Sequence, residues 1–493
     1  MKKNDKQIMN KKEILKIPNN WVWVKLGDIC LQPQYGWTTS AAKKGTLRLL
    51  RTTDITSGSI DWDSVPFCEK EPAKKGKYLL KDGDIVISRA GSVGYSILVK
   101  DPKKAVFASY LIRFRPLTNV NYVAYFLQSP LYWKSISEKR LGIAVPNVNA
   151  SKLKQIGFPL PPLPEQQKIV EKIEGLFTKL DAGVEVLKKI KNQIKQYRQA
   201  VLKYAFEGKL TEEWRKENKD KLEPASVLLE KIKKEKKKQQ GKKYKELPPV
   251  DTSKLPELPE GWVWSKLGEL VTFEYGKGLR KDKRQLNGNV PVYGSNGLVG
   301  YHSVSLTEKS CLVVGRKGSS GSIHLSRVPC WPIDTTYFIE PPKEVNLFFL
   351  YYLLSTLNLG SLDKSTAIPG LNRNDAYVLP IPFPPHLEQH KIVEEIEKQF
   401  SVADEIEKVV DQSLKQAERL RQSILKKAFE GKLTEKWREE QLKDPNSPLN
   451  KEPADKLLER IKAEKAKLQK EKKANRKKGK QSKKPAFRQT RRR

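Results

Sequence analysis

The stretch at residues 165–215, which begins EQQKIVEKIE and ends AFEGKLTEEWR, occurs twice in this chain. The second copy, residues 388–438, begins EQHKIVEEIE and ends AFEGKLTEKWR. The same offset matches Glu165 with Glu388 at the start and Arg215 with Arg438 at the end, so the two copies align without a gap. A gapless repeat of this length indicates a duplicated structural unit.

Each copy has the pattern of one long helix. Prolines precede each copy, and Gly208 or Gly431 stands where a glycine C-cap is expected. About 42 residues at 1.5 Å per residue would form a rod of roughly 60 Å. Apolar residues recur every three or four positions and predict a seam on one face. The seam residues are Ile169, Ile173, Leu180, Leu187, Ile194, Phe206, Ile392, Ile396, Phe400, Leu414, Ile424 and Phe429, and the same stripe includes Leu176, Tyr197, Ile406 and Leu420.

A rod of this length cannot bury its apolar face on itself. The other copy is the expected partner, in an intramolecular coiled coil. The alternative is that the two helices each cover a separate globular domain, although helices in that role are usually shorter.

The charge of the chain points to a polyanionic partner. The 493 residues include 95 Lys and Arg against 57 Asp and Glu, a formal net charge of +38. A surplus of this size favours nucleic acid as the partner. A basic tail without a specific role explains only part of the surplus, because Lys and Arg also run through the middle of the chain.

The remaining composition argues for a cytoplasmic protein. The four cysteines are scattered singly, which predicts neither a disulfide framework nor a zinc site. The basic N-terminal stretch, MKKNDKQIMNKKEILK, has no apolar run that would make it a secretory signal, and no apolar segment is long enough to span a membrane.

The chain divides into seven predicted segments. Two globular segments open alike, with IPNNWVWVKLGDI and LPEGWVWSKLGEL, and their short apolar runs and late helical patterns predict mixed α+β domains. A Lys-rich run and a Pro-rich stretch follow the first helix, and a basic tail follows the second. The segments are an N-terminal extension (1–16), a first domain (17–160), a first helical region (161–215), a Lys/Pro-rich linker with a short helix (216–257), a second domain (258–383), a second helical region (384–438), and a short helix with a disordered basic tail (439–493).

Two features of the domains suggest binding. A strand in each domain ends in a basic, glycine-rich turn, RAGSVG at 89–94 and RKGSSG at 316–321, whose backbone N–H groups and side chains can meet phosphates or base edges. A tight hairpin without a ligand explains the turns equally well. A Tyr-Gly pair also recurs, and there a plain strand-end turn is favoured. The candidate DNA-binding residues are Tyr35, Arg51, Arg89, Ser92, Tyr275, Lys277, Arg280, Arg316, Lys317 and Ser319.

No catalytic motif was found in the sequence. The DNA amino-methyltransferase motif, the ATPase phosphate loop and a paired-carboxylate nuclease core do not occur. His386 and His390 have a zinc-compatible spacing, but the HExxH order is missing and the first copy has Leu163 and Gln167 there. We therefore predict a non-catalytic chain without a metal. An enzyme with a divergent active site and a coiled-coil scaffold for nucleic acid or acidic proteins stay open as alternatives.

Three repeated motifs carry a resemblance to a known family. The domains open with Pro-x-x-Trp-x-Trp-x-x-Leu-Gly, the helices open with Pro-Pro-x-x-Glu-Gln-x-x-Ile-Val, and both helices close with Ala-Phe-x-Gly-x-Leu-Thr. Together they resemble the specificity (S) subunit of type I restriction-modification systems over nearly the whole chain. The Lys-rich linker and basic tail are longer than this resemblance leads us to expect.

The resemblance implies a DNA reader within a larger complex. Each globular domain would be a target-recognition domain that reads one half of a bipartite, asymmetric DNA site with an unread spacer. The helices would form an antiparallel coiled coil that docks two methyltransferase subunits, with restriction subunits joining them. This chain would bind no cofactor, and S-adenosylmethionine, ATP and Mg would belong to the partner subunits. A reader for a methylation-only or phage-exclusion system is the alternative.

Overall fold

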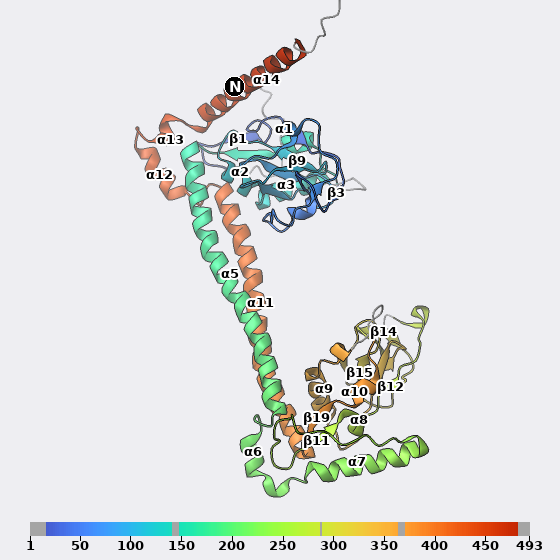
Figure 1. The fold of residues 1–493 in the computed structure, drawn as a ribbon. Helices are drawn as coiled ribbons and strands as arrows, with labels where there is room; N and C mark the ends of the chain where they lie inside the picture. Colours follow the sequence, from blue (N-terminus) through green and yellow to red (C-terminus); the bar gives the residue numbers. More distant parts are fainter. Residues whose placement is uncertain (1–15, 141–146, 286–287, 363–369, 482–493) are drawn as a thin grey trace, which may run out of the picture. The chain divides into compact units, whose positions relative to one another are not determined.

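The computed structural model describes residues 16–140, 147–285, 288–362 and 370–481. The predicted N-terminal extension and the last residues of the basic tail therefore lie almost entirely outside the described residues. The chain forms two compact units (Figure 1). Unit 1 contains residues 1–186 and 413–493, and unit 2 contains residues 187–412. Both long helices contribute one half to each unit.

Three small sheets form the globular part of unit 1. The antiparallel sheet that carries the glycine-rich turn has the order β2 (Gln34–Tyr35), β9 (Leu111–Phe114), β6 (Ile85–Ser88) and β7 (Ser96–Leu98). A mixed sheet has the order β3 (Ala41–Ala42), β5 (Phe67–Cys68), β4 (Arg48–Leu50) and β8 (Ala105–Phe107). The opening strand β1 (Val22–Lys25) pairs antiparallel with β10 (Gly157–Leu160). The short helices are α1 (Lys75–Tyr78), α2 (Val120–Phe126), α3 (Pro130–Arg140) and α4 (Ala150–Lys154).

Strand β6 is buried on both faces because its side chains alternate between two cores. Ile85 and Ile87 belong to the core that includes α2, whereas Val86 belongs to a separate core with Phe107. This double burial explains why the sequence reads IVIS without the polar alternation of a half-exposed strand.

Unit 2 repeats the topology of unit 1 in two of its three sheets. The sheet with the second glycine-rich turn has the order β12 (Glu274–Tyr275), β18 (Thr336–Ile339), β15 (Cys311–Gly315) and β16 (Ile323–Ser326). Strand β11 (Val263–Lys266) pairs antiparallel with β19 (Pro380–Phe383), as β1 pairs with β10. The third sheet has the order β14 (Gly297–His302), β13 (Val290–Gly294) and β17 (Trp331–Pro332). The short helices are α8 (Leu267–Leu270), α9 (Leu347–Thr356) and α10 (Arg373–Tyr377).

The repeated stretches form the long helices α5 (Leu163–Phe206) and α11 (His386–Phe429), which have 44 residues each. Inside unit 1, Asp181 of α5 forms an ion pair with Arg421 of α11. Inside unit 2, Arg198 of α5 forms an ion pair with Asp404 of α11. The two aspartates occupy equivalent positions of the repeat, as do the two arginines, so one antiparallel contact is made once in each unit. The predicted mixed fold with two long helices is confirmed.

The ends of the long helices do more than pack on each other. Ile169 and Ile173 share a core with the first domain and with Ile424 and Phe429 of α11. Ile392 and Ile396 share the core of the second domain, with Phe206 and Phe400 packed against it. Both of the expected arrangements therefore occur, because each helix covers a domain at its ends. Of the other predicted seam residues, Ile194 is buried and Leu180, Leu187 and Leu414 are half-buried.

Four positions of the predicted stripe are wrong. Leu176, Tyr197, Ile406 and Leu420 are 38–48% exposed. Phe177 is buried instead, whereas Ala403 and Val410, which belong to the same predicted stripe, are buried as expected. An α-helix has about 3.6 residues per turn, whereas steps that alternate between three and four residues average about 3.5. A stripe extended by such steps over many turns therefore moves off the buried face.

A buried, hydrogen-bonded carboxylate lies at each end of the pair of long helices. Glu165, at the start of α5, is fully buried. Its side chain accepts hydrogen bonds from Trp21 Nε1 (2.9 Å), Thr434 Oγ1 (2.8 Å) and Arg438 (2.8 Å). In unit 2, Glu388 accepts from Trp262 Nε1 (2.8 Å), Thr211 Oγ1 (2.7 Å) and Arg215 Nε (2.8 Å). The paired arginine and the neutral donors supply the partners that a buried charge requires.

These contacts explain why the repeated motifs occur together in the sequence. The tryptophan opens a domain, the glutamate opens a helix, and the threonine and arginine follow the end of the other helix. The intervening Gly208 and Gly431 have φ values of +69° and +72°, which confirms the predicted glycine caps.

A helix that follows each long helix docks on the domain of the same unit. In unit 2, α6 (Glu212–Glu217) leads to α7 (Ala225–Gln240), which buries Ala225, Leu228, Leu229 and Ile232. In unit 1, α12 (Glu435–Lys443) and α13 (Pro448–Lys451) lead to α14 (Ala454–Gln481). The expected short helix before a disordered tail is therefore wrong as far as residue 481, because α14 is a helix of 28 residues. No helix of the described residues is both long and apolar enough to cross a membrane.

Candidate nucleic-acid interface

The glycine-rich turn of unit 1 begins where the central strand β6 ends. Gly91 and Gly94 have φ values of +76° and +92°, a region that favours glycine, and Gly94 N donates to Ser88 O at 2.9 Å. The turn holds Arg89 with its guanidinium 5.2 Å from the ring centre of Tyr35. The predicted Arg89 and Tyr35 therefore form one cation–π pair at the end of the sheet.

The turn of unit 2 has the same construction. Gly318 and Gly321 have φ values of +82° and +76°, and Gly321 N donates to Gly315 O at 2.8 Å. The guanidinium of Arg316 lies 5.5 Å from the ring centre of Tyr275. The structure thus brings the two separate sequence features, the basic turn and the Tyr-Gly pair, to one place in each unit.

Both tyrosines are partly accessible, with exposed fractions of 40% for Tyr35 and 52% for Tyr275. The glycines after them are required for packing, since a Cβ on Gly36 or Gly276 would lie 2.1 Å from the backbone carbonyl oxygen of Ala108 or Ile333, the residues that directly follow β8 and β17. The Tyr-Gly pair therefore lies at a strand end, as expected, although no turn follows it, and the strand end also places the ring beside the arginine.

Each turn is also joined to the segment that precedes the last short helix of its domain. Val148 N donates to Arg89 O at 3.1 Å, and Leu371 N donates to Arg316 O at 2.9 Å. Tyr35 Oη accepts a hydrogen bond from Ala150 N at 3.0 Å. The equivalent of Ala150 in unit 2 is Arg373, whose guanidinium lies 4.8 Å from the ring centre of Tyr275. Arg373 was missed in the sequence, although the repeated Asn149 and Asn372 before it mark both helix starts.

Polar atoms without a protein partner gather at both turns. Arg89 Nε and Arg316 Nε are buried and make no hydrogen bond with a described residue, and the same holds for Thr52 Oγ1, Asn147 Oδ1 and Ser320 Oγ. Buried polar atoms in proteins nearly always have a partner. Hydrogen-bonding capacity is thus available beside the accessible tyrosine rings, and sequence reasoning did not single out Thr52, Asn147 or Ser320.

The other predicted residues differ in whether their side chains form ion pairs and in how exposed they are. Arg51 forms an ion pair with Asp54 (2.8 Å), which raises the pKa of the guanidinium mainly through that hydrogen bond. Arg280 pairs with Asp282 (3.3 Å). Lys277, Lys317 and Ser319 are exposed, and Ser92 is half-buried.

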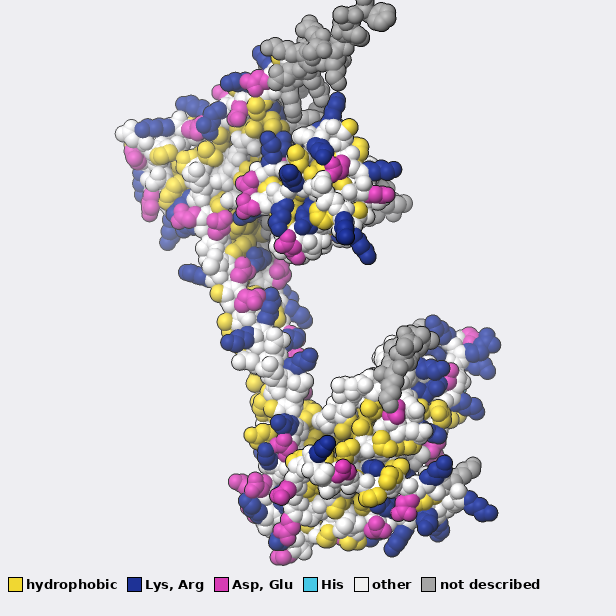
Figure 2. All heavy atoms as spheres, viewed as in Figure 1, with side chains coloured by type: hydrophobic (Ala, Val, Ile, Leu, Met, Phe, Trp, Pro, Cys, Tyr) yellow, Lys and Arg dark blue, Asp and Glu magenta, His cyan; other side chains and the backbone are white. Residues whose placement is uncertain are grey.

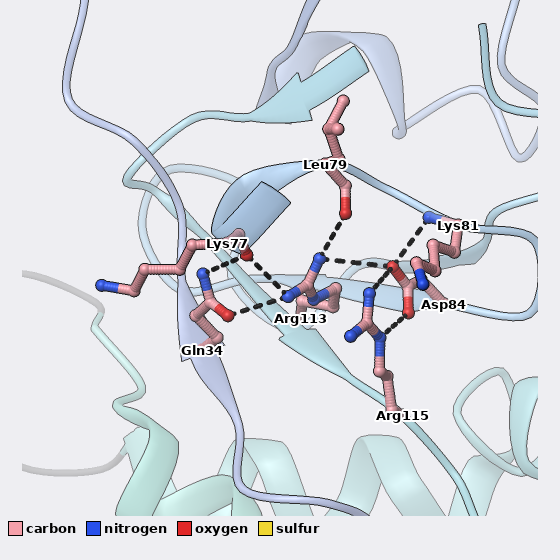
Figure 3. Close-up of polar contacts among 7 residues, drawn as sticks. All are labelled: Gln34, Lys77, Leu79, Lys81, Asp84, Arg113 and Arg115. Carbon is pink, nitrogen blue, oxygen red and sulfur yellow. Dashed lines mark hydrogen bonds and ion pairs between the residues drawn. The ribbon is translucent and has the colours of Figure 1, made fainter. Parts of the chain in front are cut away.

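The surroundings of the two turns differ strongly. In unit 1, Arg113 donates to Gln34 Oε1 (2.8 Å) and Leu79 O (2.7 Å), and Asp84 lies between Arg113 and Arg115 (Figure 3). Burial lowers the pKa of Arg113 to about 10. This network ties the strand that carries Tyr35 to the segment around α1. In unit 1 this network lies next to the site, since Gln34 precedes Tyr35 on β2.

In unit 2 the network is replaced by apolar residues and thiols. Arg113 pairs with Val86 of β6, and in the same register Phe338 pairs with Val313 of β15. The position of Asp84, one residue before β6, corresponds to Cys311, whose Sγ lies 3.4 Å from Cys330 Sγ. The two units therefore share the arginine–tyrosine pair but not the side chains that support it.

The described residues contain no group of three or more His, Cys, Asp and Glu side chains that could hold a metal ion. His386 and His390 stack edge to face at 4.9 Å, and Asn346 Nδ2 lies 3.0 Å from His390 Nδ1.

Two units of shared topology, each with an arginine–tyrosine turn in different surroundings, define a class of duplicated proteins built on paired long helices. A family model described as "Type I restriction modification DNA specificity domain" matches residues 18–196 and 259–416. The match covers more than half of the sequence, and the chain belongs to this family of type I restriction-modification specificity subunits.

Known relatives agree with the family assignment. The chain is 29% identical over 364 residues to the EcoDI specificity subunit of Escherichia coli, covering 68% of this chain and 76% of that relative. It is 27% identical over 437 residues to the EcoKI subunit of Escherichia coli strain K12, covering 86% and 90%. A solved chain from a type I restriction-modification system superposes with a TM-score of 0.57 at 16% identity, covering 85% of this chain and 99% of that one, which supports the fold.

Proposed function

We propose that this chain reads a bipartite, asymmetric DNA site, with one half-site read by each unit and an unread spacer between the halves. The observation that carries the proposal is the arginine–tyrosine turn, which occurs once in each unit on equivalent strands. Arginine is the side chain most often used to recognise guanine in the major groove, and the net charge of +38 supplies affinity for phosphates. The different surroundings of the turns favour two different half-sites over a palindrome.

The long helices are proposed to dock the partner subunits of the complex, two methyltransferase subunits that restriction subunits then join. Val186 on α5 and Val409 on α11 occupy equivalent positions of the repeat, and both are 58% exposed. Val402 and Ile406 extend the exposed apolar surface on α11 in unit 2. Such residues favour a protein partner over solvent. The chain itself is proposed to act without a cofactor, with S-adenosylmethionine, ATP and Mg bound by the partners.

The methylated bases of a host genome test this proposal. Single-molecule sequencing of the host with and without the gene should show one asymmetric, bipartite motif that loses methylation when the gene is deleted. A palindromic or undivided motif would contradict the two-reader proposal. The absence of any gene-dependent motif would favour a reader that acts without methylation, as in a phage-exclusion system.

A further inference from the structure

Helix α7 is fixed on unit 2 by one face. Its apolar residues Leu228, Leu229 and Ile232 are buried in the core of the second domain. Farther along the same face, Lys236 Nζ donates to Gly268 O (2.7 Å) and Val271 O (2.9 Å). Lys233 forms an ion pair with Glu269 at 3.0 Å. The segment predicted to be a linker is therefore held in a defined orientation on the domain.

The opposite face of α7 carries unpaired positive charge. Lys234, Lys237 and Lys238 are exposed, and their helical spacing places Lys234 and Lys238 opposite the docked residues and Lys237 at the side of the helix, one turn after Lys233. None of the three forms an ion pair with a described residue of the chain. Like charges at this spacing repel one another and destabilise a helix slightly, so the face is not explained by the stability of α7.

Helix α14 of unit 1 provides an internal comparison. It docks through Leu457 and Ile461, the equivalents of Leu228 and Ile232, and Lys465 Nζ donates to Gly27 O as Lys236 donates to Gly268 O. The docking face is thus repeated. The positions of Lys234 and Lys237, however, are Ala463 and Ala466 in α14. Docking therefore does not require Lys234 and Lys237, which are specific to α7, whereas the position of Lys238 is also a lysine in α14, Lys467.

The docked face of α7 contacts the segment that leads to the candidate interface of unit 2. Lys236 contacts Val271, four residues before Tyr275, so the C-terminal half of α7 runs beside the chain that enters β12. Lys and Arg side chains gather over this end of unit 2 (Figure 2). A duplex read at Tyr275 would continue past the reading site toward neighbouring basic side chains.

We propose that Lys234, Lys237 and Lys238 bind the phosphate backbone of duplex DNA that flanks the half-site read by unit 2. This inference rests on the proposed function and adds a sequence-independent contact to it. The chemistry favours duplex DNA over other polyanions. The face has no exposed aromatic ring on which single-stranded bases could stack, and the apolar face that a membrane helix would insert is already buried against the domain.

The test replaces Lys234 and Lys237 by alanine, the residue that α14 has at both positions. The full-length chain and its K234A/K237A variant are titrated with fluorescent duplexes of target and non-target sequence over a potassium chloride series. Each lost phosphate contact should lower the slope of log affinity against log salt by about 0.9, so the double variant should lose about 2. Affinity for both duplexes should fall several-fold by the same factor, which leaves the preference for the target unchanged.

A charge-matched control is available in the same unit. Lys216 and Lys219 are paired with Glu212 and Glu260 at 2.8 Å, so K216A/K219A removes two charges that are already neutralised. The proposal is overturned if this control lowers the slope as much as K234A/K237A, or if K234A/K237A binds like the wild type. It is also overturned if K234A/K237A keeps its DNA affinity but no longer co-purifies with the methyltransferase. If the wild-type chain shows no preference for the target, the proposed function itself fails.

Discussion

At the scale of single residues, the arginines of the two turns lie against aromatic rings. Arg89 lies on Tyr35, and Arg316 lies between Tyr275 and Tyr337, whose ring centres are 5.5 and 6.0 Å from its guanidinium. Stacking fixes the plane of the guanidinium, which reduces the entropy lost when its fork meets a base edge. The backbone hydrogen bonds of the turn fix the position of the arginine backbone.

Alanine at Arg89 or at Arg316 should weaken binding of the target DNA by about 1–3 kcal/mol per lost base contact. Binding of non-target DNA should change much less, because phosphate contacts carry no sequence information. Competition titrations with both duplexes measure the two effects. Tyr35→Phe is the matched control, since it keeps the ring under Arg89 and removes only the hydroxyl that accepts from Ala150. Equal losses on both duplexes would assign the arginines to backbone contacts.

Lys236 gives a prediction for pH. Burial lowers the pKa of its amine to about 8, whereas an unfolded lysine titrates near 10.4. Folded unit 2 therefore binds fewer protons than the unfolded chain between these two pH values, and its free energy of unfolding should rise with pH there. A neutral amine still has two protons for Gly268 O and Val271 O.

Denaturant titrations at pH 7 and pH 10 measure this dependence for the wild type and for Lys236→Met. As the pH rises, the free energy of unfolding of the wild type should increase by roughly 1–3 kcal/mol relative to that of the variant. A constant difference would show that the amine is not desolvated in the folded protein. Below pH 8 the difference should stay constant, since the amine is then protonated in both states.

At the scale of elements, the repeat in the sequence predicted the helices well and their faces only in part. Bounds, caps and the antiparallel pairing follow from proline, glycine and apolar spacing. The exposed Leu176 and Ile406 and the buried Phe177 show the limit, because the buried face is set by drifting helical phase and by the domains at each end. The docking of α7 was equally hidden, since a Lys-rich stretch shows only four apolar contact residues.

Two substitutions on α5 separate folding from partner binding. Ile173→Asp places an unpaired charge in the core of unit 1 and should cost several kcal/mol of stability. Val186→Asp changes an exposed position and should leave the melting temperature nearly unchanged while it prevents co-purification with the methyltransferase. Calorimetry and affinity purification measure the two outcomes. Normal assembly of Val186→Asp would exclude this face of the helix as the docking surface.

At the scale of the whole molecule, two units repeat one plan with separate cores. The repeated sheets and docked helices were partly visible as matched motifs in the sequence. The sites were less predictable, because the arginine–tyrosine pairs join residues that are distant in the sequence and the supporting side chains differ. No spacing rule links Tyr275 to Arg373, and only the folded sheet brings them together.

Separate cores predict independent half-sites. A hybrid in which residues 258–383 come from a related specificity subunit should keep one half-site and acquire a new one. The joins lie at proline-rich segments, and the tryptophan that contacts Glu388 belongs to the opening motif of the domain, so assembly should be retained when the donor has that motif. Mapping of methylated bases reads both halves in one experiment. If both half-sites change together, recognition by the two units is not independent.

The buried cluster around Glu165 also determines when unit 1 can be completed during translation. Unit 2 is one continuous segment, residues 187–412, whereas unit 1 needs Thr434 and Arg438 to satisfy Glu165. The first domain emerges early but waits through synthesis of the whole of unit 2 for its last helix. Unit 1 can therefore be completed only after unit 2 has been synthesised, unlike a chain whose N-terminal domain is one continuous segment. A chain that ends at residue 412 therefore contains the whole of unit 2 but lacks the residues that satisfy Glu165 in unit 1.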